Sequence, residues 1–248
     1  MNEHLRYGYA GVSAEPVLAL PYLRRVYSLF SLGIALAVAG ALVALYVGEP
    51  TLVQARGQVV AIPPVVAFGI EHWILSLLGY FGAFFAVSAL RRTPGVNVLA
   101  LGGYTFVSGL FFAPALFFAQ LAASSGTTLS AAPVRDAFLL TAGAFIGLTS
   151  YTLVTRRDFS FLGATLNMGL WVVLGASLLA IFFQAQVLNL AIASVCVLLF
   201  GGYILYDTSR LLRESDRTDP VSDALSLFLD VVNLFLALLR ILSAARDR

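Results

Sequence analysis

The sequence predicts an all-α integral membrane protein with seven transmembrane helices. Of the 248 residues, 60% are hydrophobic and only 11% are charged, whereas about a quarter of the residues of a soluble globular chain are charged. The mean hydropathy is +0.90, and the apolar residues are concentrated in long runs. A helix of about 20 apolar residues is long enough to cross the ~30 Å hydrocarbon core of a bilayer.

Seven such runs follow one another along the chain. They extend over Val26–Val47, Trp73–Leu90, Val98–Leu121, Ala137–Val154, Phe161–Phe183, Val187–Leu212 and Leu225–Ser243. The second run is the shortest, and the apolar segment Val65–Ile70 can extend it outward past Glu71 and His72. The first run is longer than the ~15-residue apolar segment of a signal peptide, so we expect it to remain as a helix.

The remaining segments do not predict a second folded domain. We expect residues 1–22 to form a cytoplasmic N-terminal tail and residues 23–248 to form the transmembrane domain. The outer loop at 48–64 and the Ser/Thr-rich loop Ala122–Ala132 are too short to fold alone.

The arginines predict the orientation in the membrane. Pairs occur at every second connection (Arg24–Arg25, Arg91–Arg92, Arg156–Arg157), and Arg210, Arg213 and Arg217 follow at the next one. With Arg6, these positions hold ten of the fifteen arginines, and the positive-inside rule then places the N-terminus in the cytoplasm. Only Arg56 and Arg135 fall in outer loops.

The last segment has two alternatives. Seven full crossings put Arg240, Arg246 and Arg248 on the outer side, against the charge rule, whereas a segment that enters and returns puts them inside.

Composition excludes several function classes. The chain has no lysine, which excludes a retinal Schiff base. One cysteine and two histidines cannot build a disulfide framework or a His/Cys metal cage, so zinc hydrolase chemistry is not expected. The net charge of +2 does not indicate a nucleic-acid partner.

Small residues are spread through the predicted spans. Gly143 and Gly147 form a GxxxG pattern, and Gly109 is also in a span. Such residues allow helix backbones to approach closely in lipid. We interpret them as packing positions within one bundle rather than as a dimer face, and we expect a monomer.

Two aspartates lie inside predicted spans, where a carboxylate costs on the order of 2.5–3.5 kcal/mol and so marks a candidate functional site. Asp207 is in the sixth span, with Tyr203 and Arg210 on its helical face. Asp230 is roughly 10 Å into the seventh span, and Asn233 shares its face. Asp207 can also be an interfacial carboxylate that pairs with Arg210, and Asp230 a protonated acid in the core.

The two aspartates are on consecutive helices joined by the short polar loop Arg213–Ala224. Consecutive antiparallel helices usually pack together, so we expect the carboxyls of Asp207 and Asp230 within about 4–6 Å of each other. Two carboxylates in contact do not both ionise cheaply, so the pair is expected to hold a proton near neutral pH and to titrate as a unit. This is the outline of a pH sensor or a cation site.

Two segments resemble a known family. Residues 201–212 read Gly-Gly-Tyr-Ile-Leu-Tyr-Asp-Thr-Ser-Arg-Leu-Leu, and residues 224–242 read Ala-Leu-Ser-Leu-Phe-Leu-Asp-Val-Val-Asn-Leu-Phe-Leu-Ala-Leu-Leu-Arg-Ile-Leu. Both are similar to the signatures of the Bax inhibitor-1/YccA (TMBIM) family. Weaker similarities occur at 155–163 and 109–116, and the resemblance extends from about residue 20 to the C-terminus.

The resemblance implies that the last helix is surrounded by the other six. It also implies a paired-aspartate site, here Asp207 and Asp230, which in pH-sensitive members gates a calcium leak. An arginine of the second helix latches the site in such members, and Arg91 is the nearest candidate. The supporting residues around the pair are Tyr203, Tyr206, Arg210 and Asn233.

The leading functional hypothesis is a pH-sensitive calcium or cation leak. Asp207 and Asp230 would be the sensor and transient calcium ligands, because calcium favours six to eight oxygen ligands and the pair supplies too few for a tight site. No resident cofactor is expected.

Two alternatives come from other classes. Bacterial YccA-like members restrain a membrane-anchored ATP-dependent protease, so this chain can be a non-conducting regulator of such a complex in the bacterial inner membrane, with residues 1–22 as the recognition segment. Tyr206-Asp207 is also similar to one motif of intramembrane aspartyl proteases. Phe228-Leu229 stands where the second motif needs glycines, so we do not expect an enzyme.

Overall fold

The computed structural model describes residues 19–55, 58–124, 130–183, 186–213 and 219–246. In chain order the elements are α1 (Ala19–Tyr46), β1 (Thr51–Ala55), β2 (Gln58–Ile62), α2 (Pro64–Glu71), α3 (Trp73–Leu90), α4 (Val96–Ala122), α5 (Ala132–Thr155), α6 (Leu162–Phe183), α7 (Gln186–Arg213) and α8 (Pro220–Arg246). Most of the expected N-terminal tail lies outside the described residues, but residues 19–22 belong to α1 rather than to the tail.

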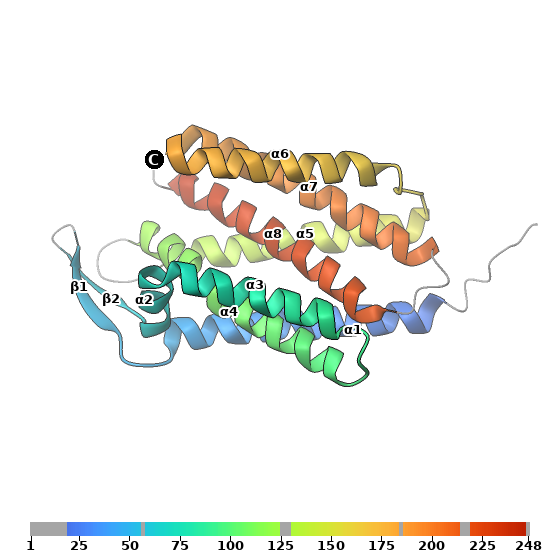
Figure 1. Ribbon diagram of the computed structural model, residues 1–248. Coiled ribbons are helices and arrows are strands. Elements are labelled where there is room, and N and C mark those ends of the chain that lie inside the picture. Colours follow the sequence, from blue (N-terminus) through green and yellow to red (C-terminus); the bar gives the residue numbers. More distant parts are fainter. Residues whose placement is uncertain (1–18, 56–57, 125–129, 184–185, 214–218, 247–248) are drawn as a thin grey trace, which may run out of the picture.

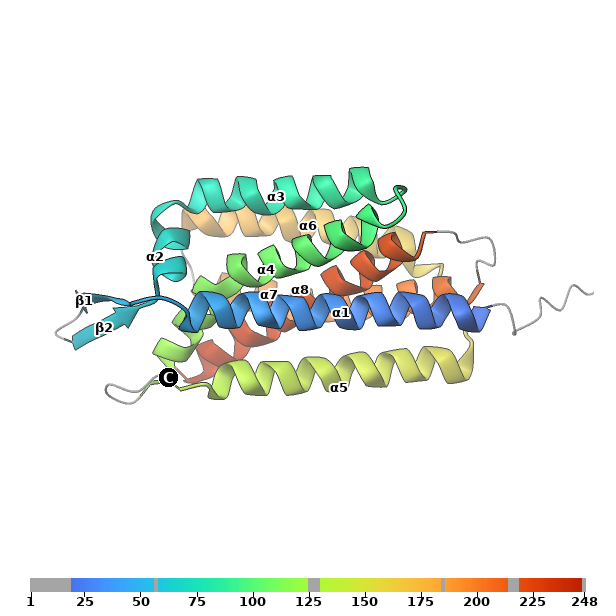
Figure 2. The ribbon, with the colours of Figure 1, turned by 90° about the horizontal axis from the view of Figure 1, so that it is seen from below.

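Seven of these helices, α1 and α3 to α8, are long and apolar enough to cross a membrane. Each overlaps one of the seven predicted spans over nearly the whole length of that span, and the second span coincides with α3 at both ends. The helices run side by side in one elongated bundle (Figures 1 and 2). The structure therefore confirms the prediction of an all-α membrane protein.

The two ends of the bundle differ in what they carry. The α3–α4 and α5–α6 connections, the last turn of α7 and the first turn of α8 lie at the end where α1 begins, which we call the N-terminal end (Figure 1). The β-hairpin and α2 lie at the opposite end, which we call the hairpin end. The arginine pairs thus gather at the N-terminal end, as the alternation along the chain predicts.

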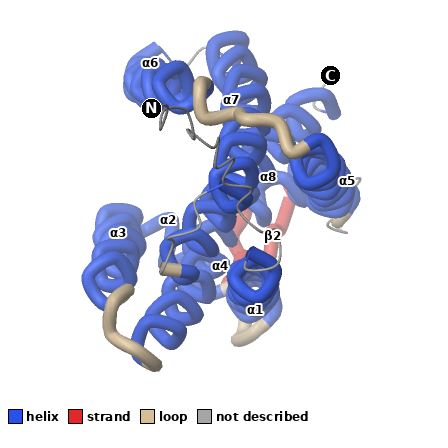
Figure 3. Tube along the Cα trace, turned by 90° about the vertical axis from the view of Figure 1, so that its right-hand side faces the viewer, coloured by secondary structure: helices blue, strands red, loops and turns tan. Residues whose placement is uncertain are grey.

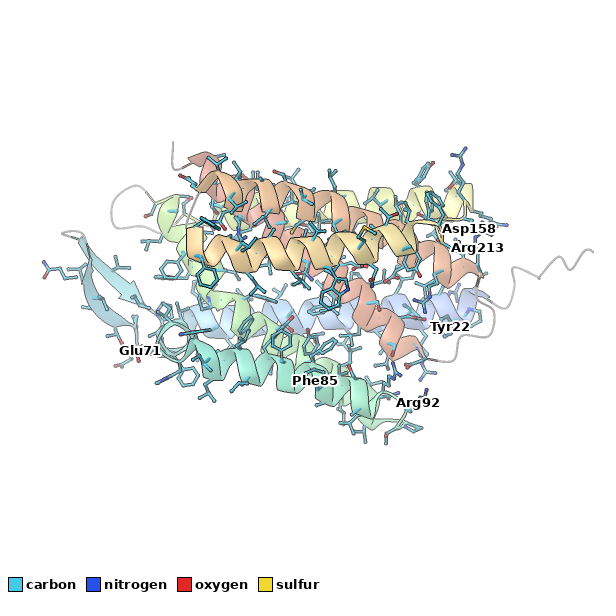
Figure 4. All side chains as sticks on the ribbon, turned by 45° about the horizontal axis from the view of Figure 1, so that its top comes forward. Tyr22, Glu71, Phe85, Arg92, Asp158 and Arg213 are labelled. Carbon is cyan, nitrogen blue, oxygen red and sulfur yellow. The ribbon has the colours of Figure 1, made fainter. Side chains whose placement is uncertain are left out.

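Large apolar side chains cover the outside of the bundle. Phe85 on α3 is 65% exposed and points away from the other helices (Figure 4). Trp171 on α6 and Leu198 on α7 are also exposed. A soluble monomer rarely exposes apolar surface of this extent, and a bilayer is the environment that solvates it.

The prediction that Val65–Ile70 extends the second span is wrong. These residues form the separate helix α2, which lies across the hairpin end (Figure 2). Pro64 stands in the first turn of α2, where its missing N–H is not needed. At His72 the backbone leaves helical geometry (φ −115°, ψ 44°), and this residue separates α2 from α3.

The outer loop at 48–64 forms a two-stranded antiparallel hairpin. Its register pairs Thr51 with Ile62 and Ala55 with Gln58. An isolated hairpin is marginally stable, and this one packs Val60 and Ile62 against the apolar cluster around Val66 at the end of the bundle.

Helix α8 is the innermost helix (Figure 3). It packs directly against α1, α4, α5 and α7, whereas α3 packs chiefly on α4 and α6 on α7. Leu227, Phe228 and Leu234 of α8 are almost fully buried in the main apolar cluster. The last helix is therefore enclosed by four neighbours, and the other two helices form an outer layer.

The structure also distinguishes between the two alternatives for the last segment. Helix α8 is continuous from Pro220 to Arg246, and it ends at the opposite end of the bundle from the start of α1 (Figure 1). At a rise of 1.5 Å per residue its 27 residues span roughly 40 Å. The segment crosses the bundle once and does not return.

The glycines divide into two groups. Gly40 of α1 and Gly109 of α4 lie at a backbone contact: a Cβ at Gly109 would meet the carbonyl oxygen of Ala37, and one at Gly40 would meet that of Phe106. These two positions allow α1 and α4 to pack closely. The same interpretation is wrong for Gly143 and Gly147, because both are exposed and a Cβ there would meet nothing within 4 Å.

Candidate functional site

The candidate site lies where α7 and α8 pack side by side near the N-terminal end. Asp207 is six residues before the end of α7 at Arg213, and Asp230 is ten residues after the start of α8 at Pro220. With a rise of 1.5 Å per residue, these offsets put the two residues roughly 9 and 15 Å into the bundle. The connection between the helices is short, so α7 and α8 are antiparallel neighbours over this whole length.

The structure brings Asp207 and Asp230 together. The Asp230 side chain is 6% exposed, and it interacts directly with the Asp207 carboxyl. Its Oδ2 atom has no hydrogen-bond partner among the described residues. A buried carboxyl oxygen without a partner is costly in a low-dielectric interior, so this atom is available for a proton, a water molecule or a cation.

The four supporting residues are placed differently around the pair. Tyr203 lies near both carboxyls and near Tyr206. The Tyr206 ring packs against α6, where a Cβ at Gly163 would come within 2.9 Å of its Cε2 atom. Arg210 is half-buried one turn further toward the N-terminal end. Asn233 donates its side-chain N–H to the Leu229 carbonyl at 2.8 Å, within its own helix.

Arg91 does not contact either aspartate of the pair in the described part of the chain. It caps the end of α3, and its Nε lies 3.8 Å from Asp219 Oδ2. Its Nη1 donates a long hydrogen bond, 3.5 Å, to Ser222 Oγ. The arginine therefore connects α3 to the start of α8, and the structure does not place it as a latch on Asp207 and Asp230.

A second acid of α8 is tied to α1. The Tyr22 hydroxyl donates to Asp223 Oδ2 at 2.5 Å, and Asp223 is 6% exposed although it is in the first turn of its helix. A carboxylate in the first turn also interacts favourably with the helix dipole. Sequence reasoning missed this pair, because only proximity in three dimensions connects residues 201 positions apart.

We expect Tyr22→Phe to destabilise the junction of α1 and α8. The change leaves the packing of the ring in place and removes one hydrogen bond to a buried carboxylate, a bond worth about 1.5–3 kcal/mol. The measurement is thermal unfolding of the purified protein in detergent. Tyr46→Phe is the control, because Tyr46 is 69% exposed at the other end of α1. Equal melting temperatures for both variants would contradict the expectation.

The N-terminal end also carries a surface ion pair. Arg213 at the end of α7 lies 3.7 Å from Asp158 of the α5–α6 connection, and it donates to the Arg156 carbonyl at 2.8 Å (Figure 4). The Ser160 backbone N–H, which donates to Asp158 Oδ1 at 2.9 Å, lowers the pKa of Asp158, and Arg213 adds to the effect. A carboxyl with a lowered pKa stays ionised throughout the neutral range, so Asp158 cannot sense a change near pH 7.

No group of three or more His, Cys, Asp or Glu side chains that could hold a metal ion occurs in the described ranges. The Asp207–Asp230 pair offers two carboxyl groups, and hard cations such as calcium favour oxygen ligands.

The fold and the site define a class of protein: a membrane-spanning helix bundle with a pair of aspartates, one of them buried, shared between its innermost helix and an antiparallel neighbour. The chain belongs to the family of inhibitors of apoptosis-promoting Bax1, whose model matches residues 21–247. This is the family that the two signature segments resemble.

Relatives come from bacteria, animals and viruses. An uncharacterized protein of Campylobacter jejuni is 35% identical over 227 residues, which cover 92% of this chain and 90% of the relative. Protein lifeguard 4 of Mus musculus is 32% identical over 100% of this chain and 95% of its own length. The Golgi anti-apoptotic protein of Vaccinia virus (strain Lister) is 32% identical with the same coverage.

Proposed function

We propose that this protein is a pH-sensitive leak for calcium or another cation, gated by the Asp207–Asp230 pair. The observation that supports the proposal is the direct interaction of the buried Asp230 carboxyl with the half-buried Asp207 carboxyl, with one oxygen of Asp230 lacking a partner among the described residues. Intramembrane acids that face protein rather than lipid commonly mark ion or proton pathways.

The proposed gate follows from the charge of the pair. With one shared proton the pair carries a single negative charge, and α7 and α8 remain packed. When the pH rises and the proton leaves, two negative charges face each other at close range. The repulsion is relieved if the helices separate or if a cation enters between them, and either change opens a path along the interface of α7 and α8. The leak should therefore increase with rising pH.

The residues around the pair suit weak and transient cation binding. Tyr203 lies near both carboxyls, and a tyrosine hydroxyl is neutral near pH 7. Two carboxylates supply fewer than the six to eight oxygen ligands that calcium favours, so water would complete the coordination. An ion held in this way is released easily, as permeation requires.

Reconstitution tests the proposal. The purified full chain is inserted into liposomes that contain a calcium indicator, and calcium entry is followed from pH 6 to pH 8. We expect an entry rate above that of protein-free liposomes, rising with pH. Entry no faster than in protein-free liposomes at every pH would overturn the proposal of a leak.

A non-conducting regulator of a membrane protein complex is the second candidate function, and a membrane-anchored ATP-dependent protease is the candidate partner. The name of the viral relative, an anti-apoptotic protein, favours a regulatory role without implying conduction. We expect such a regulator to copurify with the protease from bacterial membranes. Loss of copurification on deletion of residues 1–18, with the bundle intact, would identify the recognition segment.

We also propose that the N-terminal end of the bundle faces the cytoplasm, in a bacterial inner membrane. In a background without Cys196, Thr93→Cys between α3 and α4 should resist an impermeant thiol reagent added to intact cells. Thr51→Cys on β1 should react, because both positions are exposed but lie at opposite ends of the bundle. The reverse labelling pattern would contradict this orientation, which the arginines predict.

A further inference from the structure

Three buried hydroxyl groups from three helices meet near the N-terminal end. They belong to Tyr27 of α1, Thr149 of α5 and Thr208 of α7. Thr208 is 0% exposed and Thr149 8%, and the Tyr27 oxygen is also inaccessible. The Tyr27 hydroxyl is close enough to interact with both threonines. None of the three oxygens makes a hydrogen bond of acceptable length and angle to any residue in the described ranges.

The two threonines differ from the other buried helical threonines in the described part of the chain. A helical threonine commonly donates its hydroxyl to the carbonyl three or four residues earlier. Thr141 donates to Ala137 at 2.7 Å, and Thr152 to Leu148 at 2.9 Å. Thr149 and Thr208 make no such bond, so neither hydroxyl is satisfied by its own helix.

The three hydroxyls have no other hydrogen-bond partner among the described residues. The Tyr27 ring packs against Phe145, with ring centroids 6.5 Å apart, and Phe145 packs against Phe30 at 4.8 Å. Buried hydroxyls in native proteins are nearly always hydrogen-bonded, either to protein or to an ordered water molecule. Three buried hydroxyls that face one another, none with a hydrogen bond of acceptable geometry in the described ranges, are suited to a single bridging molecule.

We propose that Tyr27, Thr149 and Thr208 form a buried water-binding site that connects α1 and α5 to the turn of α7 next to Asp207. A buried water molecule typically makes two to four hydrogen bonds, and three hydroxyls meet this requirement. A metal cation is a poorer occupant, because the three oxygens are neutral and too few.

Because the site includes the residue next to Asp207, the bound water would help to hold this turn of α7 in place. Thr208 follows Asp207 directly, and consecutive residues point about 100° apart around a helix of 3.6 residues per turn. On one face of this turn of α7, Asp207 points toward α8. On the adjacent face, Thr208 points toward α1 and α5, where the water would bind it. The proposal does not depend on ion conduction and holds for a regulatory protein as well.

Radiolytic hydroxyl-radical labelling of the purified full chain, read by mass spectrometry, detects bound water directly. We expect Tyr27 to be oxidised at least several times more than Tyr80. Tyr80 is the matched control, because it is half-buried like Tyr27 and its hydroxyl accepts a direct hydrogen bond from Tyr104 at 2.8 Å. Equal labelling of the two tyrosines would overturn the proposal.

Substitutions test the bridge independently. If one water joins the hydroxyls, Thr208→Val should lower the melting temperature of the protein. A variant that also carries Thr149→Val and Tyr27→Phe should then show a smaller decrease in melting temperature than the sum of the decreases of the three single variants. The reason is that substitutions of groups that share one partner do not have additive effects. If the single substitutions raise the melting temperature and their effects add, the hydroxyls are dry and the proposal is wrong.

Discussion

Asp207→Asn is expected to remove the pH dependence of the leak and to hold the entry rate at its low-pH value, and Asp230→Asn should do the same. Either change leaves at most one ionisable group in the pair, so no repulsion develops as the pH rises. Two charges about 5 Å apart in a medium of effective dielectric constant about 20 repel by about 3 kcal/mol. An energy of that size shifts a conformational equilibrium by more than about tenfold, so the wild-type rate should change by at least that factor across the titration.

The matched control for this experiment is Asp136→Asn. The half-buried Asp136 pairs with the exposed Arg135 at 2.9 Å at the hairpin end, far from the aspartate pair, and its removal should leave the pH profile unchanged. The variant that carries both Asp207→Asn and Asp230→Asn should behave like either single variant, because the pair titrates as a unit. A pH profile that persists in both single variants would show that another group is the sensor.

The seven spans and the aspartate pair could be predicted because both follow from one-dimensional patterns. Long apolar runs determine where helices cross a bilayer, and a short connection makes α7 and α8 antiparallel neighbours. The cost of burying a charge then identifies Asp207 and Asp230 as residues that must face protein. Asp207 and Asp230 lie at similar distances along their helices from the connection between α7 and α8, so they lie at similar depths in the bundle.

The contacts at the N-terminal end could not be predicted in the same way. The partner of Arg91 depends on how the end of α3 is positioned over the start of α8, which no local pattern specifies. Asp219 and Asp223 lie in a segment that reads only as a polar loop, and the chain gives no signal that Tyr22 reaches the second of them. Similarly, the site formed by Tyr27 and two threonines takes one residue from each of three helices that are far apart in the sequence.

Local chemistry explains the errors at the hairpin end. The segment Val65–Ile70 is apolar enough to extend a span, but Pro64 begins a helix there and His72 ends it. The glycine pattern was misleading for a related reason. A GxxxG sequence shows that close approach is allowed, whereas the packing partner is set by the tertiary arrangement, and Gly143 has none among the described residues.

Gly109→Ala is expected to lower the melting temperature substantially, whereas Gly143→Ala should leave it unchanged or raise it. A Cβ at Gly109 would lie 2.8 Å from the Ala41 backbone nitrogen and would also meet the Ala37 carbonyl oxygen. These are backbone atoms that cannot move aside unless α1 and α4 separate. Overpacking of this kind costs typically about 1–3 kcal/mol and sometimes more, which corresponds to a decrease of roughly 5 °C for a chain of this size.

The same substitution at Gly143 differs only in its surroundings. The added methyl group meets nothing within 4 Å, and alanine is favoured over glycine within a helix by up to about 1 kcal/mol. Thermal unfolding of both variants in the same detergent measures the difference directly. A decrease of equal size at both positions would mean that Gly143 also has a packing partner, as in a dimer, and would contradict a monomer. A decrease at Gly109 alone would show that the contact of α1 with α4, and not a general requirement for glycine, stabilises the bundle that holds the aspartate pair.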